Sequence, residues 1–170
     1  QATHLFNGME PLHHRDPGVV GAALTLDDVY CQLIADNVHI HPAVLKLAVR
    51  AKGTGRILLI TDAMRGAGMP DGEYNLGGLA VTVLHGEARL PDGTLAGSTL
   101  TLDRALVNIM AATGLSLMDV LPMATANPAR ALNMPQKGVI AEGKDADLIV
   151  LDDQARVMLT FVGGETVYRR

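Results

Sequence analysis

The chain has 170 residues, of which 48% are hydrophobic and 19% charged, and its formal net charge is -4. This composition is typical of a globular protein with one sizeable core and excludes a disordered chain. The negative charge, without a basic stripe, argues against a nucleic-acid-binding protein, and no apolar run approaches the roughly 20 residues of a membrane span. The single cysteine, Cys31, cannot form an internal disulfide, which predicts a reducing compartment and hence a cytoplasmic protein.

The first half of the chain predicts a strand–helix–strand unit. Residues 3–15 are rich in His, Asn, Gly and Pro and predict a loop, and residues 16–24 predict a short helix or turn opening at Pro17. Buried strands are predicted at 29–36 and 56–60, separated by a helix at 42–52 whose apolar residues recur at helical spacing. This order predicts parallel pairing with a right-handed crossover.

The second half predicts more antiparallel structure. Strand-like segments at 74–76, 79–84 and 87–90 are separated by glycine-containing turn pairs, which predicts a small antiparallel excursion over about 73–92. One helix is predicted at 101–113. A second opens with a capping box formed by Ser116 and Asp119 and ends near Met123 or Ala124, and a third is predicted at 128–132 with Pro128 at its first position. Strands at 147–151, 157–162 and 165–168 give an all-β tail, with a hairpin turn at Gly163-Gly164.

Asp62 follows the second buried strand, at the strand end where parallel α/β folds gather their chemistry. We take it as the candidate catalytic carboxylate; the alternative is a cap or turn residue after a core strand. His4, Arg15 and His39 also lie on loops after predicted strands. Imidazole is a common zinc ligand, and an arginine fork suits phosphate or carboxylate. Each also has a plain structural alternative: a hydrogen-bonded histidine, or a solvated turn around Arg15.

Five short motifs, in order and at close to the right spacing, resemble those of the N-acetylglucosamine-6-phosphate deacetylase family, in the metal-dependent amidohydrolase superfamily. They are THLFNGM at 3–9, RDPG at 15–18, IADNVH at 34–39, TDA at 61–63 and TLAGS at 94–98. Residues 138–148 resemble the end of the superfamily's barrel domain. The resemblance implies an α/β fold: the C-terminal part of a (β/α)8 barrel of the TIM type over residues 1–136, followed by a small β-sandwich tail over 137–170.

The resemblance also implies roles for individual residues. His4 would be a metal ligand ending the sixth barrel strand, and Asp62, ending the eighth, would be the general base and acid. Arg15 would grip the substrate phosphate. The remaining substrate-binding residues would be Asn7, Gly8, Asp36, Asn37, Val38, His39, Leu95, Ala96 and Gly97, with His39 able to reach a neighbouring subunit's site. Gly8 stands where the family more often has Ala, a change that a backbone contact would survive.

The implied reaction is hydrolysis of N-acetylglucosamine 6-phosphate to glucosamine 6-phosphate and acetate in amino-sugar catabolism. The implied cofactor is a divalent metal, zinc before iron or others, and the implied assembly is a homodimer. Because the family's other metal ligands, a Glu and a His, would precede Gln1, we expect a C-terminal portion that is inactive without the N-terminal half. The alternatives are a superfamily hydrolase of another amide, such as a cyclic one, and a non-catalytic piece.

Overall fold

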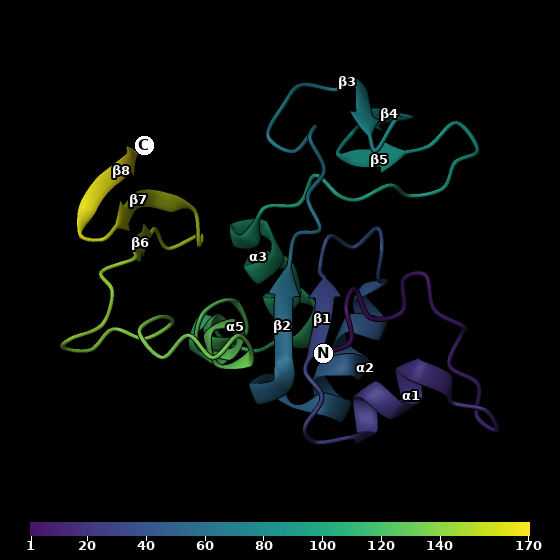
Figure 1. Ribbon diagram of the computed structural model, residues 1–170, viewed down its shortest axis with the longest axis horizontal. Coiled ribbons are helices and arrows are strands. Elements are labelled where there is room, and N and C mark those ends of the chain that lie inside the picture. The colour runs from purple at the N-terminus through teal and green to yellow at the C-terminus, as the bar shows by residue number, and fades with distance from the viewer.

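The computed structural model describes residues 1–170, which form three separate sheets and five α-helices (Figure 1). The central body holds the parallel pair β1 (Cys31–Ile34) and β2 (Ile57–Ile60), joined through α2 (Pro42–Lys52) and the short 3-10 helix η1 (Thr54–Arg56). The predicted strand–helix–strand unit and its parallel pairing are therefore confirmed.

Strand β1 is shorter than predicted because its ends are taken over by turns. At its C-terminal end, the Asp36 carboxylate accepts hydrogen bonds from the next backbone N–H groups and bends the chain away. On its outer edge, Ala2 forms a parallel bridge with Cys31. The parallel sheet therefore continues at Ala2, one residue before the loop predicted at 3–15.

Helix α2 is bounded by the signals that its sequence carries. The His41 ring accepts a hydrogen bond from the N–H of Ala43 (3.2 Å), Pro42 occupies the first position, and Gly53 ends the helix at φ 74°. Its buried face packs with α1 (Gly18–Thr25) and α3 (Leu102–Thr113) into the main core around β1 and β2. This core holds the carboxyl ends of both strands at one end of the body.

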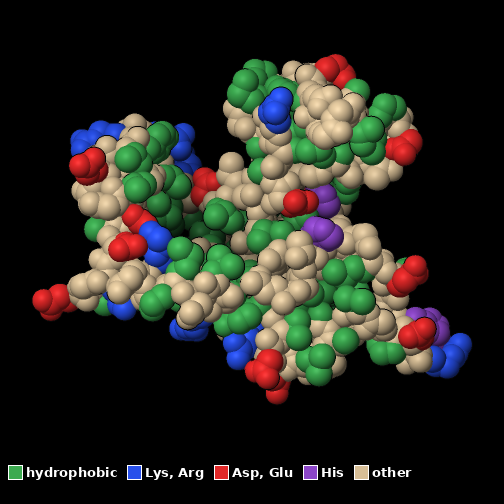
Figure 2. All heavy atoms as spheres, in the orientation of Figure 1, with side chains coloured by type: hydrophobic (Ala, Val, Ile, Leu, Met, Phe, Trp, Pro, Cys, Tyr) green, Lys and Arg blue, Asp and Glu red, His purple; other side chains and the backbone are tan.

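The predicted antiparallel excursion is the sheet β3 (Gly72–Leu76), β4 (Leu79–Leu84) and β5 (Glu87–Arg89). It has a small core of its own, made of Met64, Val81, Val83, Ala88 and Ala96. In the space-filling view it forms a lobe separated from the central body by a narrow waist, at which histidine and acidic side chains gather (Figure 2).

The helical segment after α3 contains α4 (Leu117–Val120), the 3-10 helix η2 (Leu121–Ala124) and α5 (Ala126–Ala131). The capping box of Ser116 and Asp119 is present as predicted. The prediction that Pro128 opens the next helix is wrong, since α5 begins two residues earlier. Proline is still accommodated, because N–H groups in the first turn of a helix need no intrahelical partner.

The tail consists of β6 (Leu148–Leu151), β7 (Val157–Val162) and β8 (Glu165–Arg169), paired antiparallel. These residues form one sheet, whereas a sandwich requires two sheets face to face.

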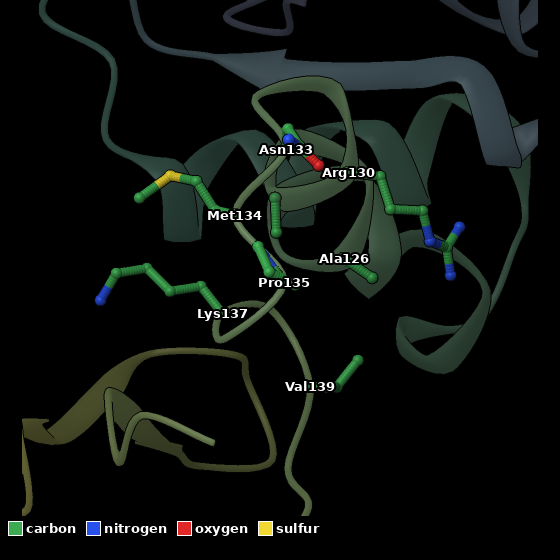
Figure 3. Close-up of a pocket in the computed structure, with 8 residues that line it drawn as sticks. Ala126, Arg130, Asn133, Met134, Pro135, Lys137 and Val139 are labelled. Carbon is green, nitrogen blue, oxygen red and sulfur yellow. The ribbon is translucent and has the colours of Figure 1, made fainter. Parts of the chain in front are cut away.

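A hollow of about 300 Å³ lies between α5 and the loop leading to the tail, with Arg130, Met134 and Lys137 along its wall (Figure 3). No single helix is long and apolar enough to span a membrane; α3 and residues 117–131 meet that test only as a sharply bent pair.

Candidate active site

A hollow of about 380 Å³ lies at the carboxyl ends of β1 and β2, between them and the segment that follows β5. It is lined by His4, Asn7, Gly8, His39, Asp62, Thr94, Leu95 and Gly97. These residues come from four loops that are far apart in the sequence. The structure thus brings both candidate histidines and the candidate carboxylate to one cavity.

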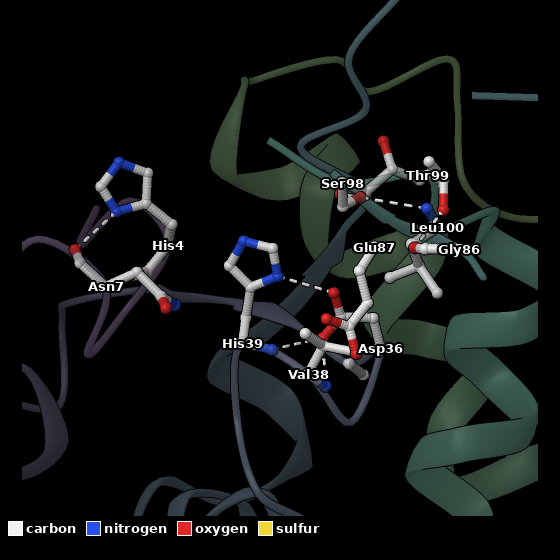
Figure 4. Close-up of polar contacts among 12 residues, drawn as sticks. His4, Asn7, Asp36, Val38, His39, Gly86, Glu87, Ser98, Thr99 and Leu100 are labelled. Atoms are coloured by element: carbon white, nitrogen blue, oxygen red, sulfur yellow. Dashed lines mark hydrogen bonds and ion pairs between the residues drawn. The ribbon is translucent and has the colours of Figure 1, made fainter. Parts of the chain in front are cut away.

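His4 is held by its own loop. Its Nδ1 is 3.0 Å from the carbonyl oxygen of Asn7, and the Asn7 amide donates in return to the carbonyls of His4 and Leu5 (Figure 4). The loop is anchored by the fully buried Leu5, whose N–H donates to the carbonyl of Gln32. With Nδ1 engaged by a carbonyl, Nε2 is the ring nitrogen left for a ligand, which is the arrangement typical of metal-binding histidines.

His39 is oriented by Asp36. The His39 Nδ1 lies 2.6 Å from the Asp36 carboxylate, which also accepts from the N–H groups of Val38 (2.9 Å) and His39 (2.8 Å) (Figure 4). Burial opposes ionisation of Asp36, but these hydrogen bonds outweigh it and hold its pKa below the usual range. Of residues 36–39, only His39 lines the hollow; Asp36 acts behind it, and Asn37 and Val38 form the turn.

Replacing Asp36 by Asn should lower the free energy of unfolding at pH 7 by about 1–2 kcal/mol, because charge-assisted hydrogen bonds become neutral ones. The lowered folded-state pKa means that this stabilisation is complete above the unfolded carboxyl pKa, near about 4, and is lost as pH falls through the folded-state value. The difference between variant and parent in denaturant unfolding should therefore shrink between pH 7 and pH 3. Asp153→Asn, at an exposed site, is the control. An equal loss of stability there would mean that the hydrogen bonds of Asp36 are not the cause of the effect.

Asp62 directly follows Thr61 at the end of β2, with a left-handed backbone at φ 50°. No helix starts there and its exposed carboxylate caps no backbone N–H, which excludes the helix-cap alternative. Its carboxylate is therefore free to meet a substrate in the hollow.

Besides Asp36, Asn37 and Val38, two more of the predicted substrate-binding residues lie outside the hollow. Arg15 sits on an exposed, projecting loop, where its Nη1 lies 2.9 Å from the His14 Nε2. Ala96 is buried in the small core beneath β4. Conversely, Thr94 lines the hollow although it was not among the predicted substrate-binding residues; its place in the TLAGS motif was the available signal.

The sequence model described as "Amidohydrolase family" matches residues 1–167. The chain belongs to the amidohydrolase family. It is 45% identical to an N-acetylglucosamine-6-phosphate deacetylase of Lysinibacillus sphaericus, over 96% of this chain and 42% of that protein. It is 43% identical to a putative N-acetylgalactosamine-6-phosphate deacetylase of Escherichia coli K12, over 95% of this chain and 97% of that protein.

The fold is likewise that of solved family members. The crystal structure of N-acetylglucosamine-6-phosphate deacetylase from Thermotoga maritima superposes with a TM-score of 0.94 at 43% identity, covering 99% of this chain and 46% of that one. The amidohydrolase chain described here therefore spans about two-fifths of the length of the relatives that it matches first.

The donor set of this amidohydrolase chain fits one position of a metal site. The free Nε2 of His4 is a suitable ligand atom, and the Asp62 carboxylate shares its cavity. No group of three His, Cys, Asp or Glu side chains is close enough to hold an ion, whereas a catalytic zinc takes three protein ligands. Residues 1–170 thus offer part of a metal site and not the complete one.

Proposed function

We propose that this chain carries the acid–base and substrate-binding side of a deacetylase that hydrolyses N-acetylglucosamine 6-phosphate to glucosamine 6-phosphate and acetate. The observation that carries the proposal is the hollow in which His4, His39 and Asp62 converge at the strand ends. The relatives of that name, at 45% and 43% identity, support the choice of substrate.

In this proposal Asp62 is the acid and base: its carboxylate accepts the proton of the attacking water and later delivers it to the amine that leaves. His4 would hold a divalent metal, zinc before iron or others, which when bound supplies Lewis-acid activation of the water and the acetyl group. Asn7, Gly8 and His39 offer polar contacts to the sugar, and Leu95 and Gly97 close over it.

The remaining metal ligands are proposed to come from residues outside 1–170. The partial donor set and the two-fifths coverage of the first relatives support this. We further propose that Ala2, β1 and β2 belong to the last three strands of a (β/α)8 barrel over residues 1–136, that residues 137–170 contribute one sheet of a sandwich, and that the assembly is a cytoplasmic homodimer. On this proposal the chain alone is inactive, so acetate release by the isolated chain would contradict it.

Arg15 is proposed to bind the 6-phosphate. In the complete, metal-loaded enzyme, Arg15→Ala should raise KM for the phosphorylated substrate by about 10- to 100-fold with little change in kcat, because a charge-assisted contact common to ground and transition states is lost. The measurement is acetate release from N-acetylglucosamine with and without the 6-phosphate. Arg130→Ala, at the distant second hollow, is the control. Equal impairment on both sugars would exclude a phosphate-binding role for Arg15 and favour another amide substrate.

A second candidate substrate is the C4 epimer, N-acetylgalactosamine 6-phosphate. The observation in its favour is the Escherichia coli K12 relative, which this chain covers over 97% of its length. The same acetate assay on both epimers, compared by kcat/KM, decides between the two candidates.

A further inference from the structure

Ser98 lies beside Asp62 and is almost completely buried, with 2% of its surface exposed. It forms a parallel bridge with Ala63: the N–H of Ser98 donates to the carbonyl of Asp62 (2.8 Å), and the N–H of Met64 donates to the carbonyl of Ser98 (2.9 Å). The backbone of Ser98 therefore holds the chain on both sides of Ala63, immediately after the candidate catalytic residue.

The Ser98 side chain extends this hold to the residue before Asp62. Its Oγ donates a hydrogen bond to the carbonyl of Thr61 and accepts one from the N–H of Leu100 at 3.0 Å (Figure 4). The hydroxyl thus acts as a donor to the segment that contains Thr61 and as an acceptor from its own segment. Through backbone and side chain together, Ser98 contacts Thr61, Asp62 and Met64.

Asp62 needs such support because its backbone is left-handed, a conformation that L residues adopt at a cost and that persists where the surroundings impose it. The neighbouring Gly97, at φ 66°, allows the close approach: a Cβ there would lie 3.1 Å from the Asp62 carbonyl oxygen and 3.0 Å from the Met64 Cβ. The left-handed backbone sets the direction of the Cα–Cβ bond of Asp62, from which its staggered rotamers place the carboxylate.

We propose that Ser98 is a positioning residue for Asp62, and that it aims the carboxylate into the hollow by fixing the left-handed turn at the end of β2. The same segment lines the hollow with Thr94, Leu95 and Gly97. Residues 94–98 therefore both line the cavity and orient Asp62. The effect of Ser98 on the reaction rate rests on the proposed function, but its effect on the conformation of Asp62 does not.

The structural test compares Ser98→Ala with Thr99→Val by NMR on the full chain. Each change removes one hydroxyl, and that of Thr99 donates away from the site, to the carbonyl of Gly86 at 2.6 Å. Ser98→Ala should speed amide exchange of Met64 about tenfold and shift the Asp62 backbone and carboxyl resonances, whereas Thr99→Val should leave them unchanged. If Ser98→Ala does not fold, Ser98→Cys is measured instead. Unchanged Asp62 resonances in a folded variant would overturn the proposal.

The kinetic test uses the complete, metal-loaded enzyme. Ser98→Ala should lower kcat by about 10- to 100-fold with KM little changed, because a misplaced acid costs rate and not substrate binding. In the Asp62→Asn background the same change should cost less than threefold. An equal cost in both backgrounds would show that Ser98 does not act through Asp62. If no deacetylation is found at all, the proposed function fails, while the NMR comparison still decides the role of Ser98.

Discussion

Asp62→Asn is expected to lower kcat for acetate release by about 10²- to 10⁴-fold while KM changes no more than a few-fold. Asparagine keeps the shape of the side chain and tolerates the left-handed backbone that Asp62 adopts. It cannot accept the proton from water or return it to the leaving amine. Steady-state kinetics of the complete, metal-loaded enzyme with N-acetylglucosamine 6-phosphate is the measurement.

The matched control is Asp153→Asn, which removes an equal charge from an exposed site in the tail. Its kinetic constants should equal those of the parent. A rise in KM with unchanged kcat for Asp62→Asn would instead assign Asp62 to substrate binding and leave the proton transfer without a residue.

The parts of the fold that were predictable are those encoded by local pattern. Ile57–Ile60 is a continuous apolar run and forms a strand buried along most of its length. The pairs Gly77-Gly78 and His85-Gly86 form the expected turns between β3, β4 and β5, and Ser116 with Asp119 forms the capping box. Each depends on neighbours within a few residues, so the sequence suffices to locate it.

The parts that were missed depend on contacts between distant segments. The bridge between Ala63 and Ser98 joins residues separated by the whole β3–β5 excursion, so no local pattern reveals that Ser98 flanks Asp62. The different roles of Asp36 and His39 also emerge only in three dimensions: both follow β1, yet the first turns inward to hold the second. The role of Arg15 stays a prediction, since its loop is exposed and the hydrogen bond that its side chain makes within the chain is to the neighbouring His14.

Asn127 is another residue whose role appears only in the folded chain. It is fully buried in α5, and its amide nitrogen donates to the carbonyls of Thr54 (2.7 Å) and Ile57 (2.9 Å), which flank the start of β2. Its amide oxygen has no partner within the chain. The two donated bonds thus connect the helical segment to the strand that presents Asp62, at the end opposite the active site.

Asn127→Asp should lower the free energy of unfolding by about 3–5 kcal/mol at pH 7, because a buried, unpaired carboxylate replaces a donor and faces two carbonyl oxygens. Burial raises the pKa of such a group in the folded state. The loss therefore begins as pH rises past the unfolded-state value near about 4 and is complete only above the raised folded-state value. Denaturant unfolding at pH 7 and pH 4.5 should show partial recovery of stability at the lower pH. The control is Asn133→Asp, at an exposed left-handed position just after the same helix, which should show little loss of stability at either pH. A comparable loss for Asn133→Asp, or a loss for Asn127→Asp that does not depend on pH, would mean that the two hydrogen bonds of Asn127 do not anchor β2.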